Sequence, residues 1–310
     1  MIKFSAFNLK ERNTVDFHGH TFTEKGRDDG TLSIEEQFII AEELNHALVS
    51  ITPHNCIEVH KQAQNPEVRH LFSGIWFPGT EIGVLVDDVP TEVLVYQFNI
   101  NTMDDELSNL PINASPDAYG RYVTQATNEM ISNQFGVNID FECVDGDCRR
   151  WLDGIHKQII EKCPGRLAKI DPRLEQCRKY FLRKGLLNPD SPLALNMGGI
   201  YHDIEFIREM VNSCGDNVQI FYAHPMESHG HMNRVRNYLT ENKLINGIEC
   251  GHPSANPTQQ QEQINYCKNH GLKITVGSDR HHHDPAKDNF IKNQHNSSEL
   301  ILQFDERYFM

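Results

Sequence analysis

Two histidines flank a glycine in the segment TVDFHGHTF, residues 14–22. The apolar residues before them are typical of a short strand, in which side chains at positions i and i+2 lie on the same face. His18 and His20 are therefore expected to project together, about 6.5–7 Å apart along the strand. Two neutral imidazoles on one face can bind one metal ion. An isolated HxH pattern is also compatible with two polar residues at a strand end, so the rest of the chain must decide.

Further candidate metal ligands follow strand-like segments later in the chain. They are His54 after HALVSIT, Glu81 after SGIWFPGT, His224 after VQIFY, and Asp279 with His281 after LKITVGS. Singly, each has a simpler explanation, such as a helix N-cap for Asp279 or a strand cap for His224. Together they place imidazoles and carboxylates at the ends of successive strands. A mixed set of nitrogen and oxygen ligands favours zinc, manganese or iron over calcium.

The elements that must position these residues alternate between strands and helices. We expect strands at 46–52, 93–100, 218–224, 245–250 and 272–278, and helices at 33–45, 201–215 and 256–271. This alternation is typical of parallel βα units, in which functional groups collect at the C-terminal ends of the strands. Residues 102–195 have helical periodicity and few strand signals, which predicts a helical insertion in an α/β domain.

Composition limits the classes of partner and the cellular location. The formal net charge of −14 disfavours avid binding to long duplex nucleic acid. No segment resembles a membrane span or the apolar core of a signal peptide, so we expect a cytoplasmic protein with no membrane partner. The cysteines include no CxxC pair, which favours reduced thiols; a zinc knot of Cys143, Cys148 and Cys163 is the alternative.

A family resemblance emerges from the order of the motifs. The series FHGHT, TPHN, PGTEI, YAHP, GIE and VGSDRH resembles the PHP (polymerase and histidinol phosphatase) family of metal-dependent phosphoesterases, over most of residues 14–283. The resemblance implies an α/β fold, namely a distorted seven-stranded β/α barrel with two or three divalent metal ions. The chain is most similar to the branch with a helical insertion, whose members act on nucleoside 3′,5′-bisphosphates or on the 5′ ends of short RNA. The implied parts are a discontinuous barrel at 1–101 and 196–290, the insertion at 102–195, and a C-terminal tail at 291–310.

The resemblance also implies a set of ligands. One metal would be held by His18, His20, Glu81 and Asp279, and Glu81 would bridge to a second metal on His224. A third metal would be held by Asp29, His54 and His281, with Asp28 as a competitor for Asp29 because the preceding loop is long. His54 and His224 are the candidates for catalytic proton transfer. Arg166 is the nearest counterpart of the family's substrate-binding arginine–histidine pair.

Two positions depart from the family pattern. Pro53 stands where the family usually has an aspartate, a plausible partner for the following histidine. Leu94 stands where a histidine usually contributes to the second metal, unless the register shifts to Tyr96 or Gln97. That metal would then be weakly held, completed by water, or absent. A second HxH pair, His229 and His231, is expected in solvent.

The expected reaction is hydrolysis of a small phosphorylated substrate by a water molecule that the metals activate. A phosphomonoester is the first expectation and a phosphodiester the second. One alternative is a catalytically weak protein that binds metal or senses phosphate, because Leu94 and Pro53 depart from the family pattern. The other is a phosphatase of a small metabolite such as histidinol phosphate, against which the inserted helices argue.

Overall fold

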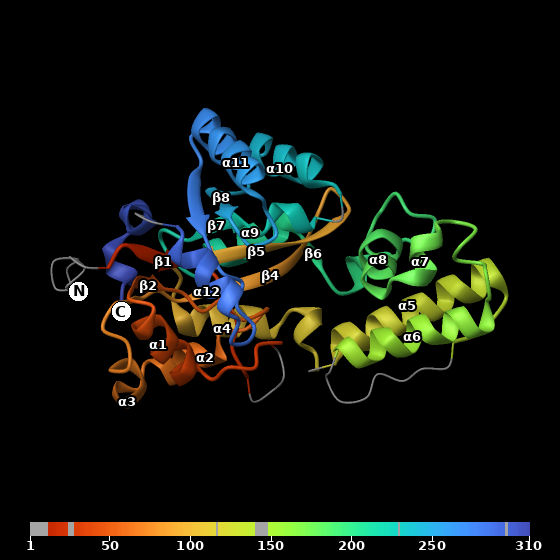
Figure 1. The fold of residues 1–310 in the computed structure, drawn as a ribbon, viewed down its shortest axis with the longest axis horizontal. Coiled ribbons are helices and arrows are strands. Elements are labelled where there is room, and N and C mark those ends of the chain that lie inside the picture. The colour runs from red at the N-terminus through yellow and green to blue at the C-terminus, as the bar shows by residue number, and fades with distance from the viewer. Residues whose placement is uncertain (1–11, 24–27, 116, 140–147, 229, 295–296) are drawn as a thin grey trace.

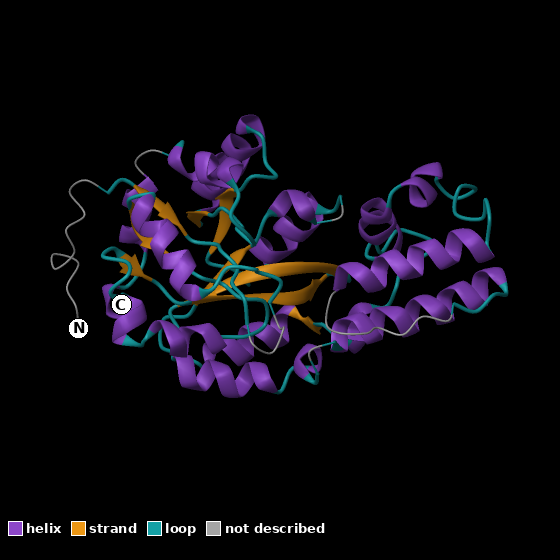
Figure 2. Ribbon diagram, turned by 60° about the horizontal axis from the view of Figure 1, so that its bottom comes forward, coloured by secondary structure: helices purple, strands orange, loops and turns teal. Residues whose placement is uncertain are grey.

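The chain forms two central sheets, covered by helices, with a group of helices that projects to one side (Figures 1 and 2). This computed structural model describes residues 12–310 apart from 24–27, 116, 140–147, 229 and 295–296, and it leaves out the side chains of 148–151 and 298. His229, Cys143 and the Cys148 side chain therefore lie outside the described part, and the zinc-knot alternative with them.

The described strands form one sheet of three strands and one of six. Their orders are β1-β2-β3 and β6-β4-β5-β7-β8-β9. The strands are β1 Thr14–Asp16, β2 His46–Val49, β3 Ile75–Trp76, β4 Gly79–Val86, β5 Val89–Tyr96, β6 His202–Asp203, β7 Gln219–Tyr222, β8 Gly247–Gly251 and β9 Lys273–Val276. The predicted α/β class with parallel strands is confirmed. The strand number differs from the seven predicted, and closure into a barrel stays a prediction.

The difference in strand number arises partly from an antiparallel hairpin, β4–β5, of which the sequence predicted only the second strand. The hairpin turns at Asp87 and Asp88, whose φ angles are 49° and 63°. Positive φ at both central residues is typical of the two-residue turn that matches the twist of the flanking strands. Strand β5 also runs antiparallel to β7, and it begins at Val89, four residues before the predicted range.

Backbone hydrogen bonds join the two sheets where β1, β2 and β9 end. Next to β1, the Phe17 amide donates to the Val276 carbonyl of β9 at 2.9 Å. Beyond β2, the Glu81 amide donates to the Pro53 carbonyl at 3.2 Å. These links hold the C-terminal ends of β1, β2 and β9 beside the start of β4, where candidate ligands lie.

The helices largely follow the sequence predictions. They are α1 Ile34–Glu43, α2 Glu58–Ala63, α3 Pro66–Arg69, α4 Ile100–Ser108, α5 Ala118–Phe135, α6 Cys148–Lys162, α7 Pro172–Gln176, α8 Arg178–Tyr180, α9 Ile204–Asn212, α10 Met232–Glu241, α11 Pro257–His270 and α12 Pro285–Lys292. The capping box of Ser33 and Glu36 starts α1, and Gly271, at φ 67°, ends α11. None of the described helices is both long and apolar enough to cross a bilayer.

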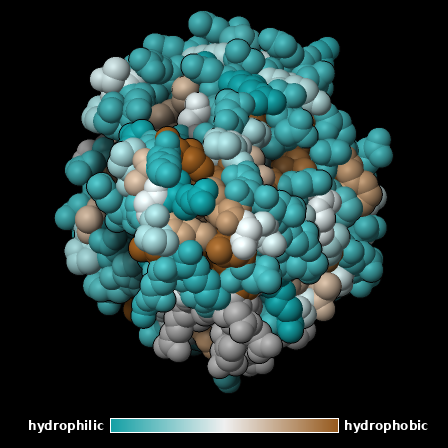
Figure 3. Space-filling view, turned by 90° about the vertical axis from the view of Figure 1, so that its right-hand side faces the viewer, coloured by the Kyte–Doolittle hydropathy of each residue, from teal (hydrophilic) through white to brown (hydrophobic). Residues whose placement is uncertain are grey.

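The apolar core is divided between the sheets and the projecting helices. Helices α4, α9, α10 and α11 pack against the face of the six-stranded sheet that points away from the three-stranded sheet. Met103 of α4, for example, shares one buried cluster with Val93 and Val95 of β5. Helices α5–α8 share a separate cluster, which includes Val123 and Ile155. The end of the molecule that these helices form is largely hydrophilic, with smaller hydrophobic areas near its centre (Figure 3). The exact division of the chain into parts stays a prediction.

The last residues pack against the three-stranded sheet. Ile301, Phe304 and Phe309 are buried in a cluster with side chains from β1 and β5. Met310 and Trp76 of β3 exchange two backbone hydrogen bonds, each of 3.0 Å. The tail therefore covers an edge of this sheet.

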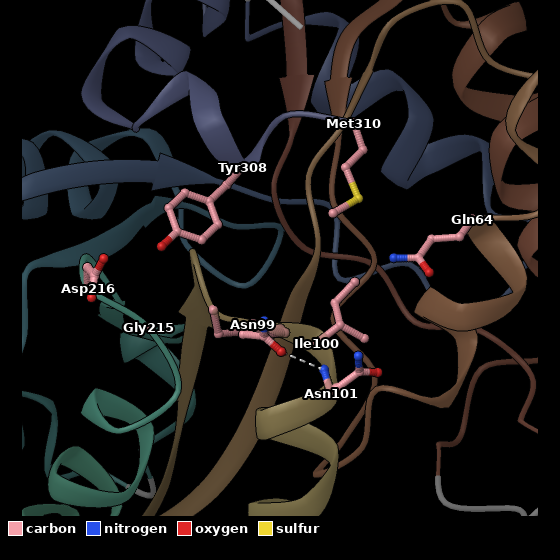
Figure 4. Close-up of a pocket in the computed structure, with 9 residues that line it drawn as sticks. Gln64, Asn99, Ile100, Asn101, Gly215, Asp216, Tyr308 and Met310 are labelled. Atoms are coloured by element: carbon pink, nitrogen blue, oxygen red, sulfur yellow. Dashed lines mark hydrogen bonds between the residues drawn. The ribbon is translucent and has the colours of Figure 1, made fainter. Parts of the chain in front are cut away.

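A pocket lies at the end of the six-stranded sheet that is away from the candidate ligands (Figure 4). Its lining includes Phe98 and Asn101 after β5, Asp216 before β7, and Tyr308 and Met310 of the tail. His224 follows the other end of β7. The pocket is thus separate from the candidate ligands.

Candidate metal centre

Four side chains predicted as ligands converge where β1, β4 and β9 meet. The Nε2 atoms of His18 and His20 lie 3.1 Å apart, and each is 3.2 Å from Glu81 Oε2. Asp279 Oδ1 lies 3.7 Å from His18 Nε2 and 3.2 Å from His20 Nε2. The side chains of the two histidines and the glutamate are fully buried, and that of Asp279 is 18% exposed.

The spacing of these four donor atoms fits a single divalent ion. Metal–nitrogen and metal–oxygen bonds of about 2.0–2.2 Å place neighbouring tetrahedral donors about 3.3–3.6 Å apart. The five separations that involve a histidine nitrogen, 3.1–3.7 Å, surround that range. We call this set of His18, His20, Glu81 and Asp279 the buried position.

Two further carboxylates orient the imidazoles of the buried position. Glu249 Oε1 lies 3.0 Å from His18 Nδ1, and Asp28 Oδ1 lies 2.8 Å from His20 Nδ1. Each contact turns the other ring nitrogen, Nε2, towards the shared centre, as carboxylates commonly do for metal-binding histidines. Asp28 is thus a partner of His20 rather than a substitute for Asp29. Glu249 lies in the GIE motif, but the sequence alone assigned it no role.

The backbone around the centre is constrained. His224 and Asp279 have φ angles of 22° and 50°, in the left-handed region that non-glycine residues rarely adopt. Gly277 is required by close packing, because a Cβ atom there would lie 2.3 Å from the Cβ atom of His18. The amide of Asp279 donates to the His18 carbonyl at 2.9 Å, which ties the β9 loop to the β1 loop.

A second group of predicted ligands is more open to solvent. Asp29 Oδ1 lies 2.9 Å from His281 Nε2 and 3.6 Å from His54 Nε2. The side chains of Asp29 and His54 are 37% and 25% exposed. The His20 ring lies between those of His54 and His281, with centroids 4.4 and 4.2 Å away. We call Asp29, His54 and His281 the outer position.

Glu81 connects these groups to His224. Its Oε1 atom lies 2.7 Å from His224 Nε2, while its Oε2 atom faces the buried position and lies 3.3 Å from His54 Nδ1. The two oxygens of Glu81 therefore face different groups of side chains, and its role as a bridging ligand stays a prediction. We call the pair of Glu81 and His224 the middle position.

The sequence prediction for strand β5 was incomplete. Leu94 pairs with Glu81 in the register, but its side chain is fully buried in the apolar cluster with Tyr96 and Phe221. Glu92, two residues earlier, reaches the centre instead: Oε2 lies 3.4 Å from His224 Nε2, and Oε1 lies 3.8 Å from His54 Nδ1. A lone glutamate at the start of the apolar run EVLVY was the available signal.

Charge interactions within the centre set its protonation. Burial alone would lower the pKa values of His18 and His20, but Glu81 and Glu249 raise that of His18, and Asp28 and Asp279 raise that of His20, well above the usual value. Against the same effect of burial, Glu81 and Glu92 raise the pKa of His224 to about 10. Without a metal these imidazoles hold protons, which a bound ion must displace.

Besides Glu249 and Glu92, two further side chains at the centre were not predicted from the sequence. His252 Nε2, after β8, lies 3.3 Å from Asp279 Oδ2. Lys287 of α12 donates to the Asp279 carbonyl and lies 3.6 Å from Oδ2. Neither residue has a ligand-like spacing from its neighbours in sequence, so no pattern marked them.

The remaining sequence candidates lie elsewhere. Arg166 follows α6 with an exposed side chain, and its amide donates to the Cys163 carbonyl; its role in substrate binding stays a prediction. His231 was expected in solvent, but its side chain is only 12% exposed. Its Nε2 lies 2.7 Å from Asn188 Oδ1, so this histidine packs against the segment that follows the projecting helices.

Comparison with known proteins places the fold among solved structures. No family model and no curated protein sequence matches the chain. An amidohydrolase from Chromobacterium violaceum, solved with bound sulfate and no metal, has a TM-score of 0.58 at 16% identity, covering 87% of this chain and 88% of that one. A protein from Bifidobacterium adolescentis, assigned as a metal-dependent phosphoesterase, has a TM-score of 0.54 at 18% identity, covering 86% and 87%. At these identities the likeness shows a shared fold.

Proposed function

We propose that the protein is a metal-dependent phosphoesterase of the PHP family, with its active site at the buried, middle and outer positions. The observation that carries the proposal is the buried position, where the Nε2 atoms of His18 and His20 lie 3.1–3.7 Å from each other and from the oxygens of Glu81 and Asp279. Glu81 connects this position to the other two. The order of the sequence motifs supports the family. One fold relative is assigned as a phosphoesterase, and the other binds sulfate, which resembles phosphate in shape and charge.

The donor set suits two or three ions of manganese, zinc or iron. Such ions lower the pKa of a bound water towards about 7 and neutralise charge on phosphoryl oxygens. The protein's own part is to hold the donors rigidly, through the contacts of Glu249 with His18 and of Asp28 with His20. Of the two candidates for proton transfer, the His54 side chain is 25% exposed and that of His224 is 10% exposed. His54 is therefore the more accessible to a leaving oxygen.

Aromatic side chains beside the centre support a nucleotide as substrate. The ring of Tyr201 packs against Gly83, which pairs with Glu92 in the hairpin, and it stacks on Tyr119 with centroids 6.0 Å apart. Residues opposite each other in a hairpin have their side-chain positions on the same face, so the ring against Gly83 lies on the face of Glu92. Aromatic rings are a common surface for nucleobases. With a net charge of −14, we expect small substrates rather than long duplexes.

Phosphate release tests the proposal. Metal-free protein would be assayed with and without Mn²⁺ on adenosine 3′,5′-bisphosphate, a 5′-phosphorylated short RNA and histidinol phosphate, with Asp279→Ala as the control. We expect Mn²⁺-dependent release from one of the nucleotide substrates and none from the control. Release from histidinol phosphate alone would assign a metabolite phosphatase. No release from protein that demonstrably binds Mn²⁺ would favour the metal-binding or phosphate-sensing alternative.

A further inference from the structure

The middle position has only two of the residues that the family resemblance assigns to it. We propose that Glu92 supplies its third protein donor, and that this carboxylate shifts the metal preference of the position from Zn²⁺ towards Mn²⁺. The inference rests on the proposed function for the presence of a metal at this position. It goes beyond the proposed function because it assigns a role to Glu92, which lies in none of the sequence motifs.

The register of the hairpin brings Glu92 to the centre. Along β5, Val93 and Val95 pack in the cluster beneath the helices, whereas Leu94 and Tyr96 pack in the cluster between the sheets. Because side chains alternate along a strand, Glu92 shares the inward face of Leu94 and Tyr96. It lies two residues nearer than Leu94 to the end of the sheet that carries His224.

The backbone holds Glu92 beside His224. The carbonyl of Glu92 accepts a hydrogen bond from the amide of Ala223, the residue before His224, at 3.2 Å. The two side chains thus start from neighbouring strands and converge. Glu92 Oε2 reaches within 3.4 Å of His224 Nε2, which itself lies 2.7 Å from Glu81 Oε1.

The surroundings of the Glu92 carboxylate point to a ligand. In the described part of the structure, its ion pairs are with two candidate ligands, His224 and His54. Its oxygen atoms, with donors of Glu81 and His54, form one of the groups within 4.8 Å that could hold an ion. Its side chain is 32% exposed, so solvent can reach the position.

The composition of the position determines which ions suit it. His224, Glu81 and Glu92 offer one imidazole and two carboxylates, compared with two of each at the buried position. Carboxylates favour hard ions such as Mn²⁺, and imidazoles favour Zn²⁺. A histidine at residue 92 would replace an oxygen donor with a nitrogen donor and remove one negative charge.

Metal binding, measured without substrate, tests the inference. Metal-free wild type, Glu92→Ala, Glu92→Gln and Glu92→His would be titrated with Mn²⁺ and Zn²⁺ by calorimetry, and bound metal would be counted by elemental analysis. We expect Glu92→Ala and Glu92→Gln to lose one Mn²⁺, or to bind it at least about tenfold more weakly. Glu92→His should still bind an ion at this position. Its ratio of Zn²⁺ affinity to Mn²⁺ affinity should be at least about tenfold higher than that of wild type.

The control is Glu227→Gln, which removes a nearby negative charge that forms an ion pair with Arg183 instead. This variant should leave the affinities for Mn²⁺ and Zn²⁺ unchanged. If it lost as much Mn²⁺ affinity as the Glu92 variants, the effect of Glu92 would be that of a distant negative charge and not that of a metal ligand. Unchanged binding in all three Glu92 variants would overturn the inference. Because Gln has the shape of Glu, Glu92→Gln keeps the test valid if Glu92→Ala does not fold. If the Glu92 variants changed metal binding as expected but the wild-type protein released no phosphate, the proposed function would be contradicted and the role of Glu92 would stand.

Discussion

The buried and outer positions lie side by side but differ in how firmly their side chains are held. At the buried position, the imidazoles of His18 and His20 are fully enclosed, and each contacts an orienting carboxylate through Nδ1. At the outer position, His54 and Asp29 are 25% and 37% exposed, and their contact is 3.6 Å long. Glu81 connects the two regions.

This difference suggests a division of work. A preorganised, enclosed set of donors binds an ion tightly, because little freedom is lost when the ion arrives. An open set binds more weakly but leaves room for substrate oxygens and for water. We therefore expect the buried position to fill first and to support the centre, and the outer position to respond to substrate.

The largest effects should follow loss of a donor from the buried position. His18→Ala and Asp279→Ala should abolish metal-dependent turnover, because they break the set of four donors, while His54→Ala should only reduce it. Phosphate release and the number of bound metals measure this, and circular dichroism checks the fold. Full turnover in His18→Ala or Asp279→Ala would contradict the assignment of these residues as metal ligands.

Loss of an orienting carboxylate should have a smaller effect. Glu249→Gln and Asp28→Asn should weaken binding at the buried position by about 10–100-fold, because the imidazoles lose their fixed orientation. Calorimetric titration with Mn²⁺ would measure the change. Asp29→Asn, which alters the outer position, serves as the matched variant, and it should spare the first ion to bind. If all three variants affected the first ion equally, the distinction between the positions would fail.

A steric change should act on the same region. In Gly277→Ala, the new methyl group would meet His18, at a cost of about 1–3 kcal/mol in the free energy of unfolding and with weaker binding of the first ion. Gly271→Ala is the control. Its φ of 67° also disfavours alanine, but nothing lies within 4 Å of its Cβ position, so it should lose stability without weaker metal binding.

The smallest difference should lie in proton release. His18 and His20 have raised pKa values and hold protons at neutral pH, whereas His281 and the neighbouring histidines keep the pKa of Asp29 low, although its partial removal from water opposes this. An ion must displace protons from these histidines, so the affinity of the buried position should keep rising with pH above about 6.5, where an imidazole with the usual pKa would already have lost its proton. Calorimetry in buffers of different ionisation enthalpy counts these protons. Release of fewer protons by the first ion than by the later ones would contradict the comparison.

Much of the scaffold could be predicted from the sequence, because short apolar runs and helix caps are local signals. Strands β2, β7, β8 and β9 and helices α1, α9 and α11 lie within or close to the predicted ranges. The hairpin was incompletely predicted because its tight turn, Asp87–Asp88, is a short polar interruption of one long apolar stretch. Its register, which buries Leu94 and presents Glu92, depends on pairing between strands.

The candidate ligands show the same contrast. The pair of His18 and His20 was predictable from its spacing after an apolar run, although β1 ends at Asp16 and both histidines lie beyond the strand that was expected to carry them. His224, Asp279 and His281 were predictable because they follow strands. The roles of Asp28, Glu249 and Lys287 depend on which loops meet in three dimensions, so spacing along the chain does not reveal them. Distances between donors, which decide whether an ion fits, are likewise a property of the folded molecule.

The covering of the three-stranded sheet by residues 297–310 has a consequence for biosynthesis. Strands β1 and β2 leave the ribosome early, but Val15 donates to Ser297, Phe17 donates to Val276, and Trp76 pairs with Met310. These partners are separated from the first strands by more than 200 residues. Contacts so distant in sequence form late and slowly. The packing of these strands against the tail therefore cannot be completed before the ribosome has synthesised residue 310.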